Sequence, residues 1–213
     1  NNTVVTMDAM HCQKETIRKI KEKKGDYIVQ LKGNHKNFYE DVSLMFEDKI
    51  ADKKCKEDYI TYSETEKNGG RIETRTCYVL KDFEYFETYK KEWKGLKTII
   101  CIKRTREING RKSEEKSYYL SSKLGTGKEL MEYTRKHWQI ENYHWILDMN
   151  YGEDNCKIYH EKSKKNLNIL RKISIKMHKQ YIENKNPKRK TISSSIRNCL
   201  TNNTKLIEFL ESF

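Results

Sequence analysis

Residues 134–148 form the segment of this chain with the most candidate catalytic side chains. Four ionisable side chains recur in it at helical spacing. At about 100° per residue, a helix places all four in one narrow stripe. They are His137, Glu141, His144 and Asp148. Large apolar residues border the stripe on both sides, namely Trp138, Trp145, Ile140 and Leu147. These borders predict that the stripe faces protein. We expect the two tryptophans and Tyr143 in the core, with base stacking as the alternative.

Glu141 is the member of this stripe best suited to catalysis. Burying an unpaired carboxylate costs several kcal/mol, roughly, so a metal ion or a cationic partner must compensate it. A metal would make Glu141 a ligand, whereas a Lys or Arg partner would make it structural. Zinc bound by His137, Glu141 and His144 is a further alternative, but the sequence lacks the H-E-x-x-H pattern of such sites. Carboxylate oxygens favour Mg²⁺ instead.

A second carboxylate, Asp8, follows the first predicted strand. Strands are predicted over residues 3–7 and 26–31, with a helix between them that ends near Gly25 and another helix over residues 36–47. Strands joined through such a helix are parallel and the crossover is right-handed. Asp8 then lies at the carboxyl end of a parallel strand, where open α/β sheets bind ligands. The structural alternative is a helix N-cap.

The middle of the chain predicts antiparallel strands, and the last third predicts helices. Turn signals at Asn68-Gly69-Gly70 and Asn109-Gly110 each separate two alternating segments. The four predicted strands cover residues 59–65, 71–80, 97–107 and 112–120. A helix over residues 163–181 is expected to turn an apolar row toward the core, made of Leu170, Ile173 and Met177. A basic linker around Pro187 precedes one or two C-terminal helices.

The composition predicts a protein that binds a polyanion. The net charge is +13 and the isoelectric point is near 9.3, which favours nucleic acid over an anionic membrane. Residues 161–190 hold eleven Lys or Arg against two acidic residues, and so carry nine of those net charges. The sequence has no apolar run near the ~20 residues that span a bilayer. Its six cysteines form no C-x-x-C pair, so we expect reduced thiols in the cytosol and no zinc site.

Five segments together resemble the bacterial insertion-sequence DDE transposases, specifically the H-repeat-associated (ISAs-type) group. They are residues 5–15 (VTMDAMHCQKE), 27–34 (YIVQLKGN), 70–75 (GRIETR), 137–142 (HWQIEN) and 148–154 (DMNYGED). The resemblance implies an α/β fold: a partial RNase H-like catalytic core with an antiparallel β-rich insertion and C-terminal helices. By this division the partial core covers residues 1–54 and the insertion residues 55–125. The catalytic-Glu helix and the basic helix cover residues 126–183, and the linker and C-terminal helices residues 184–213.

The resemblance also implies metal-dependent DNA strand cleavage and transfer. Asp8 matches the second acidic residue of the catalytic triad and Glu141 the third, so both are expected to hold two Mg²⁺ ions, or Mn²⁺ in their place. The first acidic residue has no counterpart. The chain starts at Asn1 without an initiating Met, so we expect the C-terminal part of a transposase that is inactive alone. The alternatives are an inactive DNA-binding remnant and an RNase H-like nuclease.

The remaining site residues are expected to contact DNA or to orient the metal ligands. The expected DNA contacts are Lys32, Arg71, Arg75, Arg135, Lys136, His137, Lys164, Lys165, Arg171 and Lys172. The residues expected to orient the ligands are Asn142, His144 and Asp148. The wider superfamily's Tyr-Arg-Glu-Lys signature is met only in part, because Thr134, His137 and Asp148 occupy its other three positions. The expected partners are the element's terminal repeats, target DNA and a second copy of the chain on DNA, with no membrane. The resemblance also implies a location in the bacterial cytoplasm, at the nucleoid.

Overall fold

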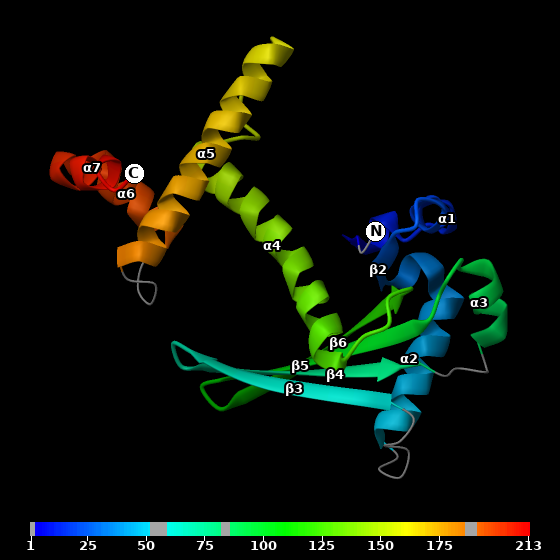
Figure 1. Ribbon diagram of the computed structural model, residues 1–213. Coiled ribbons are helices and arrows are strands. Elements are labelled where there is room, and N and C mark those ends of the chain that lie inside the picture. The colour runs from blue at the N-terminus through cyan, green and yellow to red at the C-terminus, as the bar shows by residue number, and fades with distance from the viewer. Residues whose placement is uncertain (1–2, 52–58, 82–85, 186–190) are drawn as a thin grey trace. The chain divides into compact units, whose positions relative to one another are not determined.

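The computed structural model (Figure 1) describes residues 3–51, 59–81, 86–185 and 191–213. The chain divides into two compact units, Asn1–His137 and Trp138–Phe213. Among the described residues, no helix is both long enough and apolar enough to cross a membrane. The predicted linker around Pro187 lies outside the described residues.

The first unit is built on one mixed sheet in the order β1-β2-β6-β5-β4-β3. The strands are β1 (Val4–Met7), β2 (Asp26–Leu31), β3 (Tyr59–Asn68), β4 (Arg71–Leu80), β5 (Thr98–Ile108) and β6 (Arg111–Ser121). β1 and β2 are parallel, and the other neighbours are antiparallel. This confirms the α/β class and the predicted parallel pair. The four middle strands extend that pair, because β6 bonds to β2 with Ile28 opposite Ser121.

Helices cover both faces of this sheet. On one face lie α1 (Lys14–Glu22), α2 (Lys36–Ala51) and α3 (Glu87–Glu92), around a core that includes Val29, Phe46 and Trp93. Successive side chains of a strand point to opposite faces. The neighbours of Val29 on β2 therefore point the other way, and Ile28 packs in a second cluster with Leu130 of α4 (Gly127–Tyr151). Both faces of the central strands are thus buried.

The turn between β5 and β6 has the backbone that the Asn109-Gly110 pair predicts. Asn109 has φ 50° and Gly110 has φ 75°, the left-handed region needed for a tight hairpin. A Cβ at Gly110 would meet no atom within 4 Å, so only backbone strain opposes a side chain there.

We therefore expect Gly110→Ala to lower the free energy of unfolding by about 1 kcal/mol. Urea denaturation followed by circular dichroism would measure it. Gly33→Ala is the control, because Gly33 has equal space and no positive φ, and it should be nearly neutral. Equal losses in both variants would contradict the strain argument.

The second unit is helical. It contains the end of α4, then α5 (Glu161–Lys185), α6 (Ile192–Thr201) and α7 (Asn203–Leu210). The prediction that Leu170 and Ile173 of α5 face the protein core is wrong, because these residues are 62% and 49% exposed. Ile175, His178 and Ile182 are buried instead. Both rows have helical spacing, and only the packing of neighbouring helices decides which row is covered.

Candidate functional site

Asp8 lies directly after β1 and begins the 3-10 helix η1 (Ala9–His11). Its Oδ1 accepts a hydrogen bond from the backbone N–H of His11 at 3.2 Å, so the cap that the sequence left as an alternative is present. Asp8 is half-buried at the carboxyl end of a strand that has a parallel neighbour. A carboxylate accepts at about four lone-pair positions, so the cap leaves capacity for a cation.

The loop after β2 is tied to the loop after β1. Nδ2 of Asn34 donates to the carbonyl oxygen of Ala9 at 2.7 Å. Nε2 of His35 lies 2.5 Å from the carbonyl oxygen of Cys12. These contacts hold the two strand ends together. Lys32, a predicted DNA contact, is exposed at the start of the second loop.

The part of α4 that belongs to the first unit lies against β1. Nδ1 of His137 is 3.3 Å from Oγ1 of Thr6, two residues before Asp8. Lys136 is exposed, with its Nζ 5.9 Å from the centroid of the Tyr133 ring. Of the predicted α4 residues, the structure therefore brings His137 to β1, the strand that ends directly before Asp8.

The predicted burial of the ionisable stripe is wrong. Glu141 and His144 are exposed, and Trp138 and Trp145, expected in the core, are 47% and 54% exposed. His137 ends the first unit and the rest of the stripe belongs to the second. The stripe therefore runs from one compact unit into the next, and neither encloses it. Helical spacing identified a shared face but not what covers that face.

The other two residues predicted to orient the ligands differ in their surroundings. Asn142 is exposed and lines a groove of the second unit, and Asp148 is half-buried. The described residues show no side-chain hydrogen bond between either of them and Glu141. Their orienting role stays a prediction.

The two candidate metal ligands come from different units, Asp8 from the first and Glu141 from the second. Among the described residues, no group of three or more His, Cys, Asp or Glu side chains is arranged to hold a metal ion. Carboxylate oxygens are the donors that Mg²⁺ and Mn²⁺ prefer. The donor chemistry fits such a metal, whereas the described residues do not assemble a complete set of ligands.

Arg71 and Arg75, predicted to contact DNA, pair with a buried carboxylate. Glu73 of β4 is 2% exposed and forms ion pairs with Arg71 at 2.7 Å, with Arg75, and with Arg106 of β5 at 3.1 Å. Arg75 also reaches Glu66 of β3 at 3.0 Å. The strand register places these residues on one face of the sheet. Both arginines thus have structural partners, and their DNA contacts stay predictions.

Arg135 attaches α4 to that same face. Its guanidinium pairs with Glu64 and, at 2.8 Å, with Glu66. Hydrogen bonds from Arg75 and Arg135 lower the pKa of Glu66. Arg135 therefore holds the first-unit part of α4 on the sheet, and contact with DNA would be an additional role.

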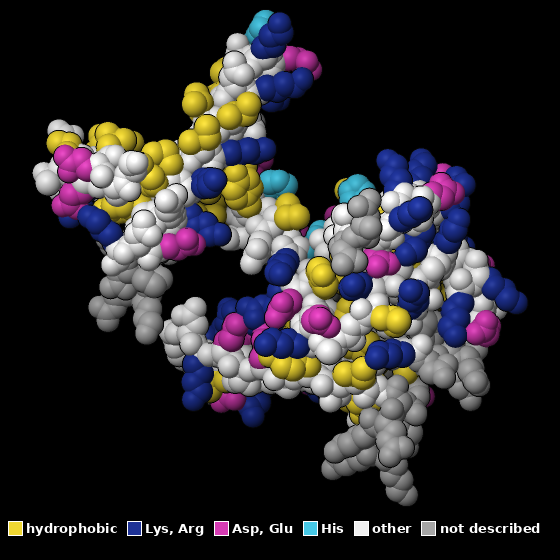
Figure 2. All heavy atoms as spheres, in the orientation of Figure 1, with side chains coloured by type: hydrophobic (Ala, Val, Ile, Leu, Met, Phe, Trp, Pro, Cys, Tyr) yellow, Lys and Arg dark blue, Asp and Glu magenta, His cyan; other side chains and the backbone are white. Residues whose placement is uncertain are grey.

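The predicted DNA contacts of α5 lie on its surface. Lys164, Lys165 and Lys172 are exposed and Arg171 is half-buried. Figure 2 shows Lys and Arg beside apolar side chains along the helices of the second unit. Lys165 also pairs with Glu161 at 3.6 Å, one turn before it.

Two further lysines were missed by the sequence reasoning. Lys176 and Lys179 line a groove together with Lys172. Positions 172, 176 and 179 have the spacing that places residues on one helix face, so the pattern could have been read from the sequence.

His178 is a buried titratable group of the second unit. It is 5% exposed, its Nδ1 is 2.9 Å from Oγ of Ser195, and its ring stacks on Phe209 with centroids 4.3 Å apart. Burial lowers its pKa below the ordinary 6.5. As the pH falls below about 6.5, the unfolded chain therefore binds a proton more readily than the folded chain, and the folded state loses stability.

We expect the free energy of unfolding to fall between pH 7.5 and pH 5.5, and to fall less in the His178→Gln variant. Urea denaturation at the two pH values measures both. His160→Gln, at an exposed histidine, should keep the parent's pH dependence. If His178→Gln keeps it too, other groups cause the loss.

A comparison with protein families finds a match over most of the chain. The family described as "Transposase DDE domain" matches residues 1–177. The chain belongs to this DDE transposase family, and the resemblance noted in the sequence is confirmed.

Three curated bacterial relatives align with the chain, and the names of two of them describe transposases. YncI of Escherichia coli O157:H7, whose name describes it as a transposase, is 33% identical over 82% of this chain and 45% of its own length. The H repeat-associated YhhI of Escherichia coli K12, also named as a transposase, is 34% identical over 73% of this chain and 42% of its own. YbfL of the same strain is also 34% identical, over 73% of this chain and 42% of its own length. The chain thus spans less than half the length of these relatives. No solved structure matches it.

Proposed function

We propose that this protein acts in the transposition of an insertion sequence, by metal-dependent cleavage and transfer of DNA strands. The family match over residues 1–177 carries the proposal. The position of Asp8 supports it, because a carboxylate at the carboxyl end of a parallel strand is where an α/β sheet binds ligands. The proposed fold of the core is RNase H-like, with the parallel pair β1 and β2 extended by antiparallel strands.

Asp8 and Glu141 are the proposed metal ligands. Two Mg²⁺ ions, or Mn²⁺, would activate the attacking hydroxyl and stabilise the departing oxygen. The backbone N–H of His11 orients the Asp8 carboxylate. Lys32, at the end of the neighbouring strand, adds a positive charge that would attract the DNA backbone.

The DNA partner is proposed to lie along the basic surfaces of both units. Lys136 of the first unit and Lys164 of the second are exposed cations. Each neutralised phosphate of a duplex adds about −0.9 to the slope of log affinity against log salt. Binding should therefore weaken steeply as salt rises. Strand transfer joins two DNA molecules, so we propose that two copies assemble on DNA.

A second candidate function is an inactive DNA-binding remnant of a transposase. The concentration of positive charge in residues 161–190 favours it, because that charge binds DNA without any catalytic group. An RNase H-like nuclease that cleaves but does not join strands is a third candidate, and it shares the proposed catalytic residues.

A plasmid assay separates these functions. The protein is expressed from its complete reading frame and mixed with supercoiled DNA that carries the element's terminal repeats, with Mg²⁺ or with EDTA. We expect nicked circles with Mg²⁺ only, and joining of a labelled 3′-hydroxyl oligonucleotide to the plasmid. Cleavage without joining would indicate the nuclease. Salt-sensitive binding that is independent of metal, without cleavage, would indicate the remnant.

A further inference from the structure

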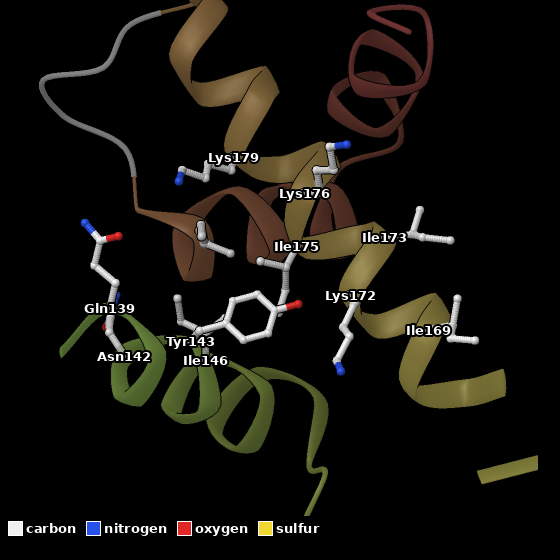
Figure 3. Close-up of a pocket in the computed structure, with 11 residues that line it drawn as sticks. Gln139, Asn142, Tyr143, Ile146, Ile169, Lys172, Ile173, Ile175, Lys176 and Lys179 are labelled. Atoms are coloured by element: carbon white, nitrogen blue, oxygen red, sulfur yellow. The ribbon is translucent and has the colours of Figure 1, made fainter. Parts of the chain in front are cut away.

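A groove of about 670 Å³ lies between α4, α5 and α6 in the second unit (Figure 3). Its floor belongs to the apolar cluster of this unit. Ile146 and Ile175 are buried there, and Ile192 packs against them. The volume is within the range of sites that bind small organic groups.

Polar contacts hold the three helices around the groove. The hydroxyl of Tyr151 on α4 is 2.7 Å from Oγ of Ser174 on α5. Nδ1 of His178 on α5 is 2.9 Å from Oγ of Ser195 on α6. The shape of the groove therefore depends on packing and hydrogen bonds within one compact unit.

One wall of the groove is positive. Lys172, Lys176 and Lys179 line it from α5, and no acidic residue is among the lining residues. Within the described parts of the chain, none of the three forms an ion pair. The helix rise separates the first two by about 6 Å along the axis and the first and third by about 10 Å. A row of unneutralised cations at this spacing suits a chain of phosphates.

The opposite wall offers amides and an aromatic ring. Gln139 and Asn142 line it from α4, and in Figure 3 the Tyr143 ring extends from α4 toward Ile175 of α5. An amide both donates and accepts hydrogen bonds, as the edge of a nucleobase does. The half-buried Tyr143 presents a ring on which a base can stack.

We propose that this groove binds an unpaired stretch of a DNA strand, with its phosphates on the three lysines and one base stacked on the open side of the Tyr143 ring, beside the isoleucine floor against which that ring packs. The inference rests on the proposed function, which supplies DNA as the partner. A duplex keeps its bases stacked inside and presents mainly phosphates, so it would leave the apolar floor unused. Only an unpaired base can reach that floor.

Charge argues against a second copy of the chain as the occupant. The segment 161–190 carries nine net positive charges, so two such surfaces repel one another. An acidic amphipathic peptide would match the lysines, and the experiment below includes it as an outcome.

The test compares the affinity of the full 213-residue chain for a labelled oligo(dT) strand and for a duplex of equal length, by fluorescence anisotropy without metal. The groove variant carries Lys172→Gln, Lys176→Gln and Lys179→Gln. The control carries Lys162→Gln, Lys164→Gln and Lys165→Gln on the same helix, outside the groove. We expect the groove variant to lose at least about tenfold in single-strand affinity and about 2 in the salt slope. The control should weaken both DNAs by equal factors.

Two variants that leave the charge unchanged test the apolar lining of the groove. Ile173 lines the groove and is 49% exposed, whereas Leu170 is 62% exposed and does not line it. Ile173→Ser should weaken oligo(dT) binding severalfold and leave duplex binding unchanged, and Leu170→Ser should change neither. Tyr143→Leu, which removes the ring but keeps an apolar side chain, should cost about fivefold or more on the single strand.

Equal losses on single strand and duplex in the groove variant would overturn the proposal. The proposal would also be overturned if Ile173→Ser left oligo(dT) binding unchanged but abolished either the association of two copies or the binding of a poly-Glu peptide. The proposed function would fail by itself if the protein showed no Mg²⁺-dependent cleavage but still preferred single-stranded DNA. The groove proposal fails alone if cleavage persists and the groove variant binds like the parent.

Discussion

Replacement of Glu141 by glutamine is expected to reduce Mg²⁺-dependent cleavage by the complete protein more than about 100-fold, because the variant loses the charge that would hold the metal. Glutamine keeps the size of the side chain and one accepting oxygen. Glu141 is exposed and forms no ion pair with any described residue, so the fold should be unchanged. Plasmid nicking measures the loss, and DNA affinity should stay within about twofold of the parent.

Asp8→Asn should reproduce this loss of cleavage. The structure indicates that this variant removes the charge without disturbing the local fold. Asp8 caps η1 through a hydrogen bond from His11, and asparagine caps a helix about as well as aspartate. The variant therefore loses the charge but keeps the cap. Glu132→Gln is the control, because Glu132 is an exposed carboxylate on α4, the helix that also carries Glu141. This variant should nick DNA like the parent. Parental activity in the Asp8 and Glu141 variants would show that neither is a catalytic ligand.

Glu73→Gln is expected to lower the free energy of unfolding by about 3 kcal/mol. Glu73 is 2% exposed and is the shared carboxylate of Arg71, Arg75 and Arg106. Without its charge, the three guanidinium groups repel one another on a face of the sheet where Arg75 is mostly shielded from water. Urea denaturation followed by tryptophan fluorescence measures the change.

Glu115→Gln provides the matched comparison. Glu115 pairs with Arg104 on neighbouring strands of the same sheet, but its side chain is 56% exposed. Water screens such a pair, so the variant should lose less than about 1 kcal/mol. Similar losses at positions 73 and 115 would show that burial does not set the strength of the Glu73 network.

Local patterns predicted much of the first unit. The alternation of residues 71–80 predicted β4, and Asn109-Gly110 predicted the turn whose φ angles are positive. Both signals depend on neighbours in the chain, namely a period of two and a residue that tolerates the left-handed region. The pairing of β2 with β6 was not predicted, because it joins Leu31 to Tyr118 across most of the unit.

The candidate site was predicted in part. The strand that precedes Asp8 and its parallel neighbour were read correctly, since a strand, a helix and a strand in succession have one favoured arrangement. The ion pairs of Arg71 and Arg75 with Glu73 were missed. Their residues alternate along one strand, but only the register with β3 and β5 shows that the carboxylate is buried.

The sequence by itself determined the family, the order of the six strands and of the long helices along the chain, and the basic character of residues 161–190, but it did not predict α3. Each of these follows from residue identity or from short-range periodicity. Only the tertiary structure decided which helix faces are covered. It left the Glu141 stripe exposed, buried Ile175 rather than Ile173, and formed the groove beside Lys172. Burial depends on which distant segments pack together, and helical spacing marks a face without identifying its partner.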